Sequence, residues 1–182
     1  WNRRLGADFH LVVKGPRRVT HLAKLAGCEQ DVATFFARVS ELRSLRAVLW
    51  QLPPFLHRDL DRLERFLSGL PRNVRHALEF RHPSWWDDEV DRLLSRYGAA
   101  FVSVSHPELP EDVRPTTDFL YLRFHGRGRR LYDYDYSREE LEEWVSRLAP
   151  HLGGRTLYAF FNNDWHANAP RNAITFHELL CP

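Results

Sequence analysis

The segment "HALEFR" (residues 76–81) has the length and apolar character of a buried β-strand, yet it carries a glutamate and an arginine near its end. Charged side chains are rarely buried unless they are paired or functional. Strand side chains alternate between two faces, so Leu78 and Phe80 share one face and Glu79 and Arg81 share the other. We predict that the apolar face packs against helices and that Glu79 and Arg81 pair with each other in a pocket.

Five further apolar runs have strand length, and they read as continuous rather than alternating, as in strands that are covered on both faces. Helical periodicity lies between the runs, except between residues 105 and 118, where prolines exclude a full helix. Ser137 and Glu140 form a capping box that starts one of these helices. The predicted strands, besides 76–81, are 9–15, 46–53, 99–105, 118–126 and 156–164, and the predicted helices are 31–44, 59–68, 87–97, 137–149 and 170–180.

Alternating strands and helices predict an α/β fold with a parallel sheet. No G-x-G-x-x-G follows any strand, which weakens a dinucleotide-binding open sheet. Polar residues follow nearly every strand, and this favours a TIM-type (β/α) barrel, whose site gathers at the carboxyl ends of all strands. Six strands are two short of eight, and the chain begins at Trp1 and contains no methionine. We therefore predict one domain, residues 1–182, that lacks the first two strands of the barrel.

Strand parity also predicts the site. Tyr121, Arg123 and His125 share a face opposite Leu120, Leu122 and Phe124, and the ends of other strands offer Lys14, Gln51 and Asn162. We expect the polar set to meet at one carboxyl edge. Simpler roles stay open: Glu79 with Arg81 as a bracing ion pair, Trp85 as a packing residue, and Asn162 with Asn163 as turn caps.

The bulk composition excludes several classes of protein. With 43% hydrophobic and 27% charged residues, the chain is globular, and its net charge of +2 gives no argument for a nucleic-acid coat or a membrane surface. No apolar run is long enough to span a bilayer, and nothing resembles a signal peptide, so we expect a cytoplasmic protein. The two cysteines lack metal or redox spacing. A metal is disfavoured because Lys14, Arg81 and Arg123 would repel a cation, and we predict no cofactor.

Six ordered motifs resemble the family catalogued as domain of unknown function 72. They are "KGPRRVTH" (14–21), "LWQLPP" (49–54), "EFRHPSW" (79–85), "YLRFHG" (121–126), "YDYDYSREEL" (132–141) and the segment 161–173 that begins "FNND". The resemblance implies a TIM-type barrel, bacterial or archaeal cytosolic relatives, a missing opening segment and no established activity. It also implies that the motif positions are Lys14, Thr20, His21, Gln51, Glu79, Arg81, His82, Trp85, Arg123, His125, Asn162 and Asn163.

Two classes of function fit these residues. The first is an enzyme, a hydrolase or lyase without a redox cofactor, that acts on a small phosphorylated or carboxylated anion, with Glu79, His82 or His125 transferring protons. Its substrate-binding residues would be Lys14, His21, Gln51, Arg81, Trp85, Arg123, Asn162 and Asn163. The second, less favoured because of the near-neutral charge, is a nucleic-acid-binding or nucleic-acid-processing protein. It would use contacts from arginine and lysine and would stack bases on Trp85, Trp86, Tyr132, Tyr134 and Tyr136.

Overall fold

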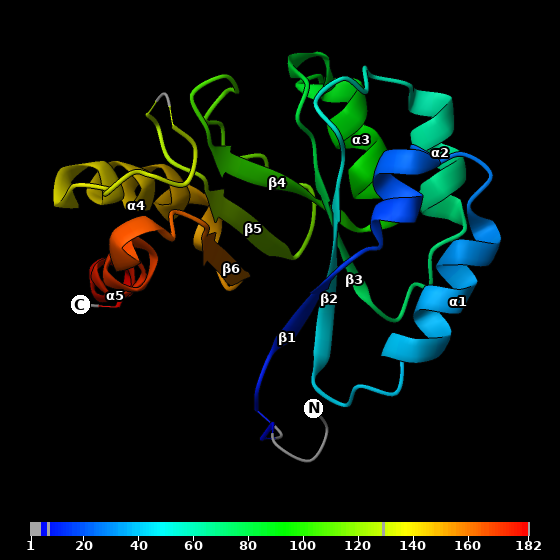
Figure 1. Ribbon diagram of the computed structural model, residues 1–182, viewed down its shortest axis with the longest axis horizontal. Coiled ribbons are helices and arrows are strands. Elements are labelled where there is room, and N and C mark those ends of the chain that lie inside the picture. The colour runs from blue at the N-terminus through cyan, green and yellow to red at the C-terminus, as the bar shows by residue number, and fades with distance from the viewer. Residues whose placement is uncertain (1–4, 7, 129, 182) are drawn as a thin grey trace. The chain divides into compact units, whose positions relative to one another are not determined.

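The computed structural model describes residues 5–6, 8–128 and 130–181; Trp1, on which the predicted truncation rests, lies outside the described residues. The chain divides into two compact units, residues 1–100 and 101–182, and each is described by itself. Figure 1 shows the course of the chain through both units.

The first unit alternates strands and helices. β1 pairs with β2 and β2 with β3, all in parallel, and the three helices lie on one face of these strands (Figure 1). The elements are β1 (Leu11–Lys14), α1 (Glu29–Val39), β2 (Leu45–Gln51), α2 (Leu60–Ser68), β3 (Arg75–Glu79) and α3 (Asp88–Tyr97), with short helical turns at Arg18–Leu22 and Pro83–Trp85.

Trp50 is the centre of the first unit's core. Its fully buried indole lies 5.7 Å from the Phe35 ring of α1 and 5.0 Å from the Phe66 ring of α2, between ring centroids. The indole N–H donates to His76 Nδ1 at 3.2 Å, so the polar atom of the tryptophan is satisfied inside the core. This packing fixes the helix-facing side of β2.

Side-chain caps set the start of two helices in this unit. The Asp59 carboxylate accepts the backbone N–H of Arg62 at the start of α2, and the Asp87 carboxylate accepts the N–H of Glu89 at the start of α3. Gly98, with φ of 63°, ends α3 in the left-handed region that favours glycine. The chain then enters β4 at once.

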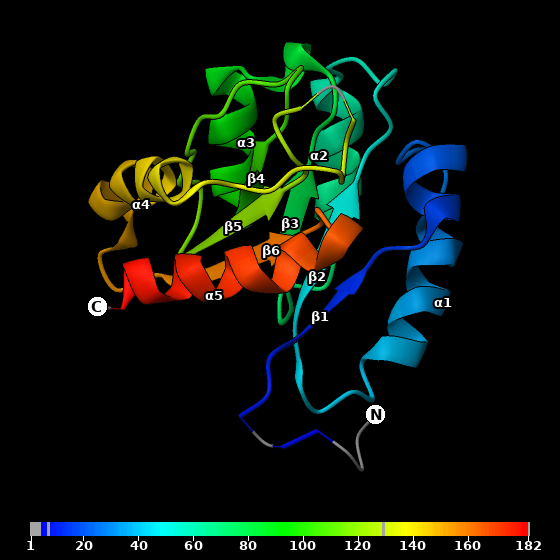
Figure 2. The same cartoon turned by 60° about the vertical axis from the view of Figure 1, so that its left-hand side comes forward.

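The second unit continues the same alternation. β4 (Ala99–Ser105), which begins at the boundary between the units, pairs in parallel with β5 (Phe119–Phe124), and β5 pairs in parallel with β6 (Thr156–Phe161). α4 (Arg138–Leu152) precedes β6, and α5 (Asn168–Leu180) follows it after a short turn at Trp165–Ala167. Figure 2 shows α5 running alongside β6.

The core of the second unit lies between β5 and the two helices. Leu120, Leu122 and Phe124 of β5 pack against Trp144 of α4 and Phe176 of α5. The predicted capping box is confirmed: the Ser137 hydroxyl accepts the N–H of Glu140, and the Glu140 carboxylate accepts the N–H of Ser137. Because the odd-numbered neighbours in β5 do not belong to this cluster, the alternation used to predict the faces of β5 is confirmed.

The six predicted strands and five predicted helices are all present, and the segment 106–118 contains no helix. The main differences are at helix ends: α1 ends at Val39 rather than 44, and α4 continues past Pro150 to Leu152. Proline inside the last turn removes one backbone hydrogen bond without stopping the helix. The α/β class with parallel strands is confirmed, whereas closure into a barrel and the absence of two strands stay predictions.

No helix in the part of the chain that the structure describes combines the length and the apolar character needed to cross a membrane.

Candidate functional site

Three predicted site residues share one edge and one face of the first unit's strands. Lys14 is in register with Leu49, two residues before Gln51, and Gln51 is in register with Glu79. Partners in parallel register point to the same face, so Lys14, Gln51 and Glu79 project together from the carboxyl ends, opposite the face that carries Trp50. This arrangement agrees with the parity prediction for the first unit.

A polar pocket of about 440 Å³ opens at the carboxyl ends of β1 and β2. Lys14 and Gln51 both line this pocket, and the ammonium of Lys14 donates to the Gln51 side-chain oxygen at 2.8 Å. The short helical turn at Arg18–Leu22, which sequence periodicity did not predict, carries two more of the lining residues and is preceded by a third. The complete lining is Lys14, Gly15, Arg17, Thr20, His21 and Gln51.

The electrostatics of this pocket are positive. The pKa of His21 lies below its ordinary value because the ring is partly buried and because Arg17 and Lys14 disfavour a further positive charge. The Thr20 hydroxyl lies 2.9 Å from His21 Nδ1, which holds the ring in place. Arg17 makes no ion pair with any residue that the structure describes. Arg17 was missed as a site residue, since nothing in its spacing separates it from Arg18 beside it.

Glu79 and Arg81 form the predicted ion pair. The Arg81 Nε–H donates to Glu79 Oε1 at 2.5 Å, and the two side chains are 9% and 0% exposed. Neither residue belongs to the lining of the pocket that contains Lys14 and His21. The pairing is therefore confirmed, while a catalytic role for Glu79 stays a prediction beside the structural role of a buried ion pair.

Two predicted site residues after β3, His82 and Trp85, have different surroundings. His82 Nδ1 contacts the Ser84 hydroxyl at 2.8 Å, and its ring lies 3.8 Å from the His57 ring, between centroids. Trp85 is fully buried, stacks on Phe80, and donates its indole N–H to a backbone carbonyl. The burial of Trp85 leaves no ring surface for a substrate, so the structure favours the packing role that the sequence left open.

The second unit also gathers predicted residues on one face. Arg123 of β5 is in register with Phe160 of β6, and the Asn162 N–H donates to the Phe124 carbonyl at 2.8 Å, which continues the pairing beyond β6. Arg123, His125 and Asn162 thus follow one another on the face opposite α4 and α5. Arg123 and His125 are both buried.

Asn163 points to the other face, where it joins the loop 132–136 to α5. Its amide N–H groups donate to the Tyr134 carbonyl at 2.7 Å and to the Asn172 side-chain oxygen at 2.6 Å. Asn172 in turn donates to Asp135 at 2.9 Å and to the Tyr136 carbonyl at 3.1 Å. These bonds fasten α5 to the loop 132–136, a structural use of Asn163 beside which its predicted role in binding stays untested.

The aromatic residues considered for base stacking are mostly engaged elsewhere. Trp85 and Tyr136 are buried, and the Tyr134 hydroxyl donates to Glu140 at 2.6 Å. Tyr132, with 41% of its surface exposed, is the one of the five that is classed as exposed. These positions give no support to the nucleic-acid alternative.

Arg127, in the basic stretch 126–130, is held by carboxylates. Its guanidinium lies 2.7 Å from Glu111, 3.1 Å from Glu140 and 3.3 Å from Glu143. Burial alone would raise the pKa of Glu111, but hydrogen bonds from Arg127 and Ser105 bring it below its ordinary value. This cluster makes Arg127 a residue that fastens a loop, and not a free phosphate ligand.

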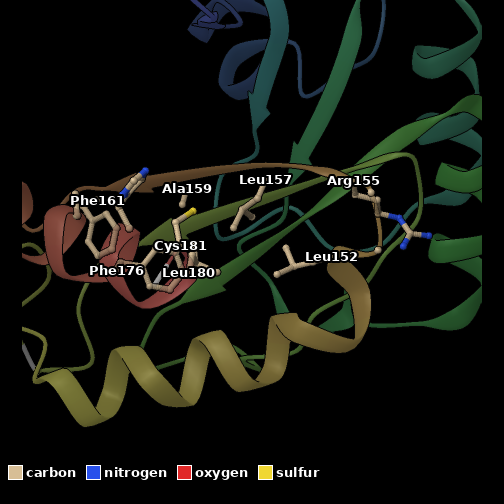
Figure 3. A pocket seen from close by; sticks show the side chains of 12 residues that line it. Leu152, Arg155, Leu157, Ala159, Phe161, Phe176, Leu180 and Cys181 are labelled. Atoms are coloured by element: carbon tan, nitrogen blue, oxygen red, sulfur yellow. The ribbon is translucent and has the colours of Figure 1, made fainter.

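A larger pocket, of about 520 Å³, lies in the second unit between β6, the end of α4 and α5. Figure 3 shows that its labelled side chains are mostly apolar, with the guanidinium of Arg155 well away from Phe161 and Phe176. That guanidinium donates to the backbone carbonyls of Thr117 and His151. The described residues include no group of three or more histidine, cysteine or acidic side chains that could hold a metal ion.

Comparison with known proteins places the whole chain in one family. The sequence profile described as "Protein of unknown function DUF72" matches residues 1–182. The UPF0759 protein YecE of Escherichia coli strain K12 is 27% identical over 207 aligned positions, and the alignment covers 99% of this chain and 75% of the relative.

Two solved structures are similar along nearly the whole chain. A DUF72 family protein of Thermotoga maritima MSB8 has a TM-score of 0.88 and 33% identity, and the match covers 98% of this chain and 76% of that one. A DUF72 family protein of Enterococcus faecalis V583 has a TM-score of 0.88 at 18% identity, with 99% and 77% covered, and supports the fold alone.

Proposed function

The chain belongs to the DUF72 family of proteins of unknown function, and we propose that its pocket at the carboxyl ends of β1 and β2 binds a small phosphorylated or carboxylated anion. The observation that carries the proposal is the composition of the lining: Lys14 and Arg17 are cationic, and Thr20, His21 and Gln51 add hydrogen-bonding groups. No carboxylate belongs to this lining. A volume of about 440 Å³ lies within the range of ordinary metabolite sites.

The charge in the pocket suits an anion in a specific way. A guanidinium presents paired N–H donors that match the oxygen atoms of a phosphate or a carboxylate, and an ammonium adds a point charge beside them. Partial burial, Arg17 and Lys14 lower the pKa of His21 and so favour its neutral imidazole near pH 7. An anion bound between Arg17 and Lys14 would offset their charges, so its binding should raise the pKa of His21.

The enzymatic form of the proposal adds proton transfer by Glu79 or His82. Glu79 is in register with Gln51, so it lies one strand away, about 4.8 Å, from the wall of the pocket and on the same face. His82 follows the end of β3 by three residues and has its Nδ1 fixed by Ser84. A hydrolase or lyase without a redox cofactor is the reaction class that this set of groups supports.

The test is phosphate binding by the wild-type protein and two single variants, measured by calorimetry at low ionic strength. Arg17→Gln removes a charge-assisted hydrogen bond, of about 1.5–3 kcal/mol, and should weaken binding about 10- to 100-fold. Arg18→Gln is the matched control because the neighbouring side chain is 75% exposed, pairs with Asp31 and is no part of the lining. Equal affinities in the two variants, or no phosphate binding in the wild type, would refute the proposed site.

A second readout uses the histidine itself. The pKa of His21, followed by NMR through its ring protons, should rise when phosphate is added to the wild-type protein. In Arg17→Gln the pKa should start higher, since one of the charges that lowers it is gone, and should respond less to phosphate. If the pKa of His21 does not change at saturating phosphate, any bound anion lies outside this pocket.

A further inference from the structure

Two of the exposed large apolar side chains lie within four residues of the chain segments that line the cationic pocket. Leu22, next to the pocket residue His21, is 72% exposed, and Phe55, four residues beyond the pocket residue Gln51, is 62% exposed. Single exposed apolar residues are normal on protein surfaces and need no explanation. Here, however, each of the two side chains comes shortly after a lining residue in the sequence, and the two lining residues, His21 and Gln51, belong to the same pocket.

Lys24 connects these two segments at the surface. Its ammonium lies 5.0 Å from the centroid of the Phe55 ring, which brings the chain that follows His21 to the chain that follows Gln51. Because Lys24 follows His21 by three residues and Phe55 follows Gln51 by four, this contact brings the Phe55 ring close to the two segments that line the pocket, although Phe55 is no part of the lining itself. A cation–π contact also leaves much of the ring open to a ligand, because 62% of the residue remains exposed.

The position of Phe55 is fixed by its neighbours. Two prolines, Pro53 and Pro54, precede it, and the Leu56 N–H donates to the Pro53 carbonyl at 3.2 Å to close a turn. Leu56 is buried and its carbonyl accepts the Trp85 indole N–H at 2.7 Å. The backbone on both sides is anchored to the core, so the outward direction of Phe55 is built into the turn and costs little entropy to keep when a ligand binds.

We propose that the ligand of this pocket is an anion that carries an aromatic ring next to its charged group, with the ring held against Phe55 and the charge held by Arg17 and Lys14. The inference rests on the proposed function and adds the chemical class of the ligand. Phosphate alone would use the lining and leave Phe55 in water. An aryl phosphate uses both, because the ring buries apolar surface against Phe55 while the phosphate keeps its contacts.

The experiment compares phenyl phosphate with methyl phosphate at pH 8, where both monoesters carry two negative charges. The wild-type protein should bind phenyl phosphate about three- to tenfold more tightly, as expected for one aromatic contact. In Phe55→Ala this ratio should fall to about one. Phe55→Leu, which keeps apolar surface without the ring, should give an intermediate ratio.

The control is Ile174→Ala, which truncates a side chain of equal exposure, 62%, in the second unit, and should leave the ratio as in the wild type. Thermal melts of each variant verify that it is folded. If methyl phosphate binds in an Arg17-dependent way but phenyl phosphate binds no more tightly, or if the preference survives Phe55→Ala, the aromatic ligand is refuted and the anion site stands. If neither ester binds, the proposed function fails and this inference fails with it.

Discussion

Substituting Gly15 by alanine should destabilise the first unit through a steric overlap with Trp50. A Cβ atom at Gly15 would lie 2.3 Å from Trp50 Cε3 and 2.6 Å from Cζ3. Carbon atoms in contact prefer about 3.5–4.0 Å, so the overlap exceeds about 1 Å. The backbone of Gly15 is not in the left-handed region, and space alone therefore makes glycine necessary.

Neither partner can move away without loss. Trp50 is fully buried, is bonded to His76 and is enclosed by rings of α1 and α2. The Gly15 N–H donates to the Leu49 carbonyl at 2.8 Å, so a retreat of the backbone would break that bond. Overpacking typically costs about 1–3 kcal/mol. The entropy that alanine removes from the unfolded chain offsets about 0.4–1 kcal/mol, which leaves a net loss of up to about 2.6 kcal/mol.

The measurement is urea unfolding followed by circular dichroism, arranged as a double-mutant cycle. Gly15→Ala should lower the free energy of unfolding in the wild-type background and have little effect in Trp50→Leu, where the clashing ring is absent. Gly69→Ala is the control, because its Cβ would meet only ordinary contacts at 3.6 and 3.8 Å. An equal cost of Gly15→Ala with and without the indole would refute the steric explanation.

Two further predictions concern charge. Burial lowers the pKa of His76, and the opposing effect of its bond to a backbone carbonyl is smaller. The unfolded chain therefore takes up a proton before the folded one, and stability is lost as the pH falls below about 6.5. In urea unfolding between pH 7.5 and 5.5, this group should change the free energy of unfolding by at most about 1.4 kcal/mol per pH unit, and an unchanged pH dependence in His76→Gln would contradict the prediction. Arg127→Met should lower stability by about 1.5–3 kcal/mol at pH 7, because the charged Glu111 loses its hydrogen bonds from Arg127 and keeps only Arg147 at 3.2 Å and the Ser105 hydroxyl at 2.8 Å. The loss should shrink as the pH falls and Glu111 becomes protonated. Exposed Arg130→Met, the control, should change stability by less than about 0.5 kcal/mol.

The parts of the fold that follow from local pattern could be predicted from the sequence. The faces of β3 and β5 follow from a period of two, which is a property of the backbone and needs no partner. The pairing of Glu79 with Arg81 also follows, since residues two apart on a strand lie on the same face. The start of α4 was predicted because both halves of its cap lie within four residues.

The parts that depend on distant segments could not be predicted. Arg17 and Arg18 look alike in sequence, and only the turn that follows β1 sends one into the pocket and the other to Asp31. Trp85 resembles a substrate platform in sequence, but the Leu56 carbonyl, 29 residues away, fixes it in the core. Arg127 resembles a loop cation until its carboxylate partners, 13 to 16 residues away, are known.

Glu140 performs three tasks with one side chain. Its Oε2 accepts the Ser137 N–H at 2.9 Å at the start of α4, and its Oε1 accepts the Tyr134 hydroxyl at 2.6 Å and Arg127 at 3.1 Å. Substitutions of Glu140 should therefore differ in which of its three contacts they remove. Glutamine could still cap the helix but would remove one of the three negative charges around Arg127, and aspartate would be too short to reach all three donors. Because the loop and the helix share this single carboxylate, a relative with a different loop should carry a different helix start as well.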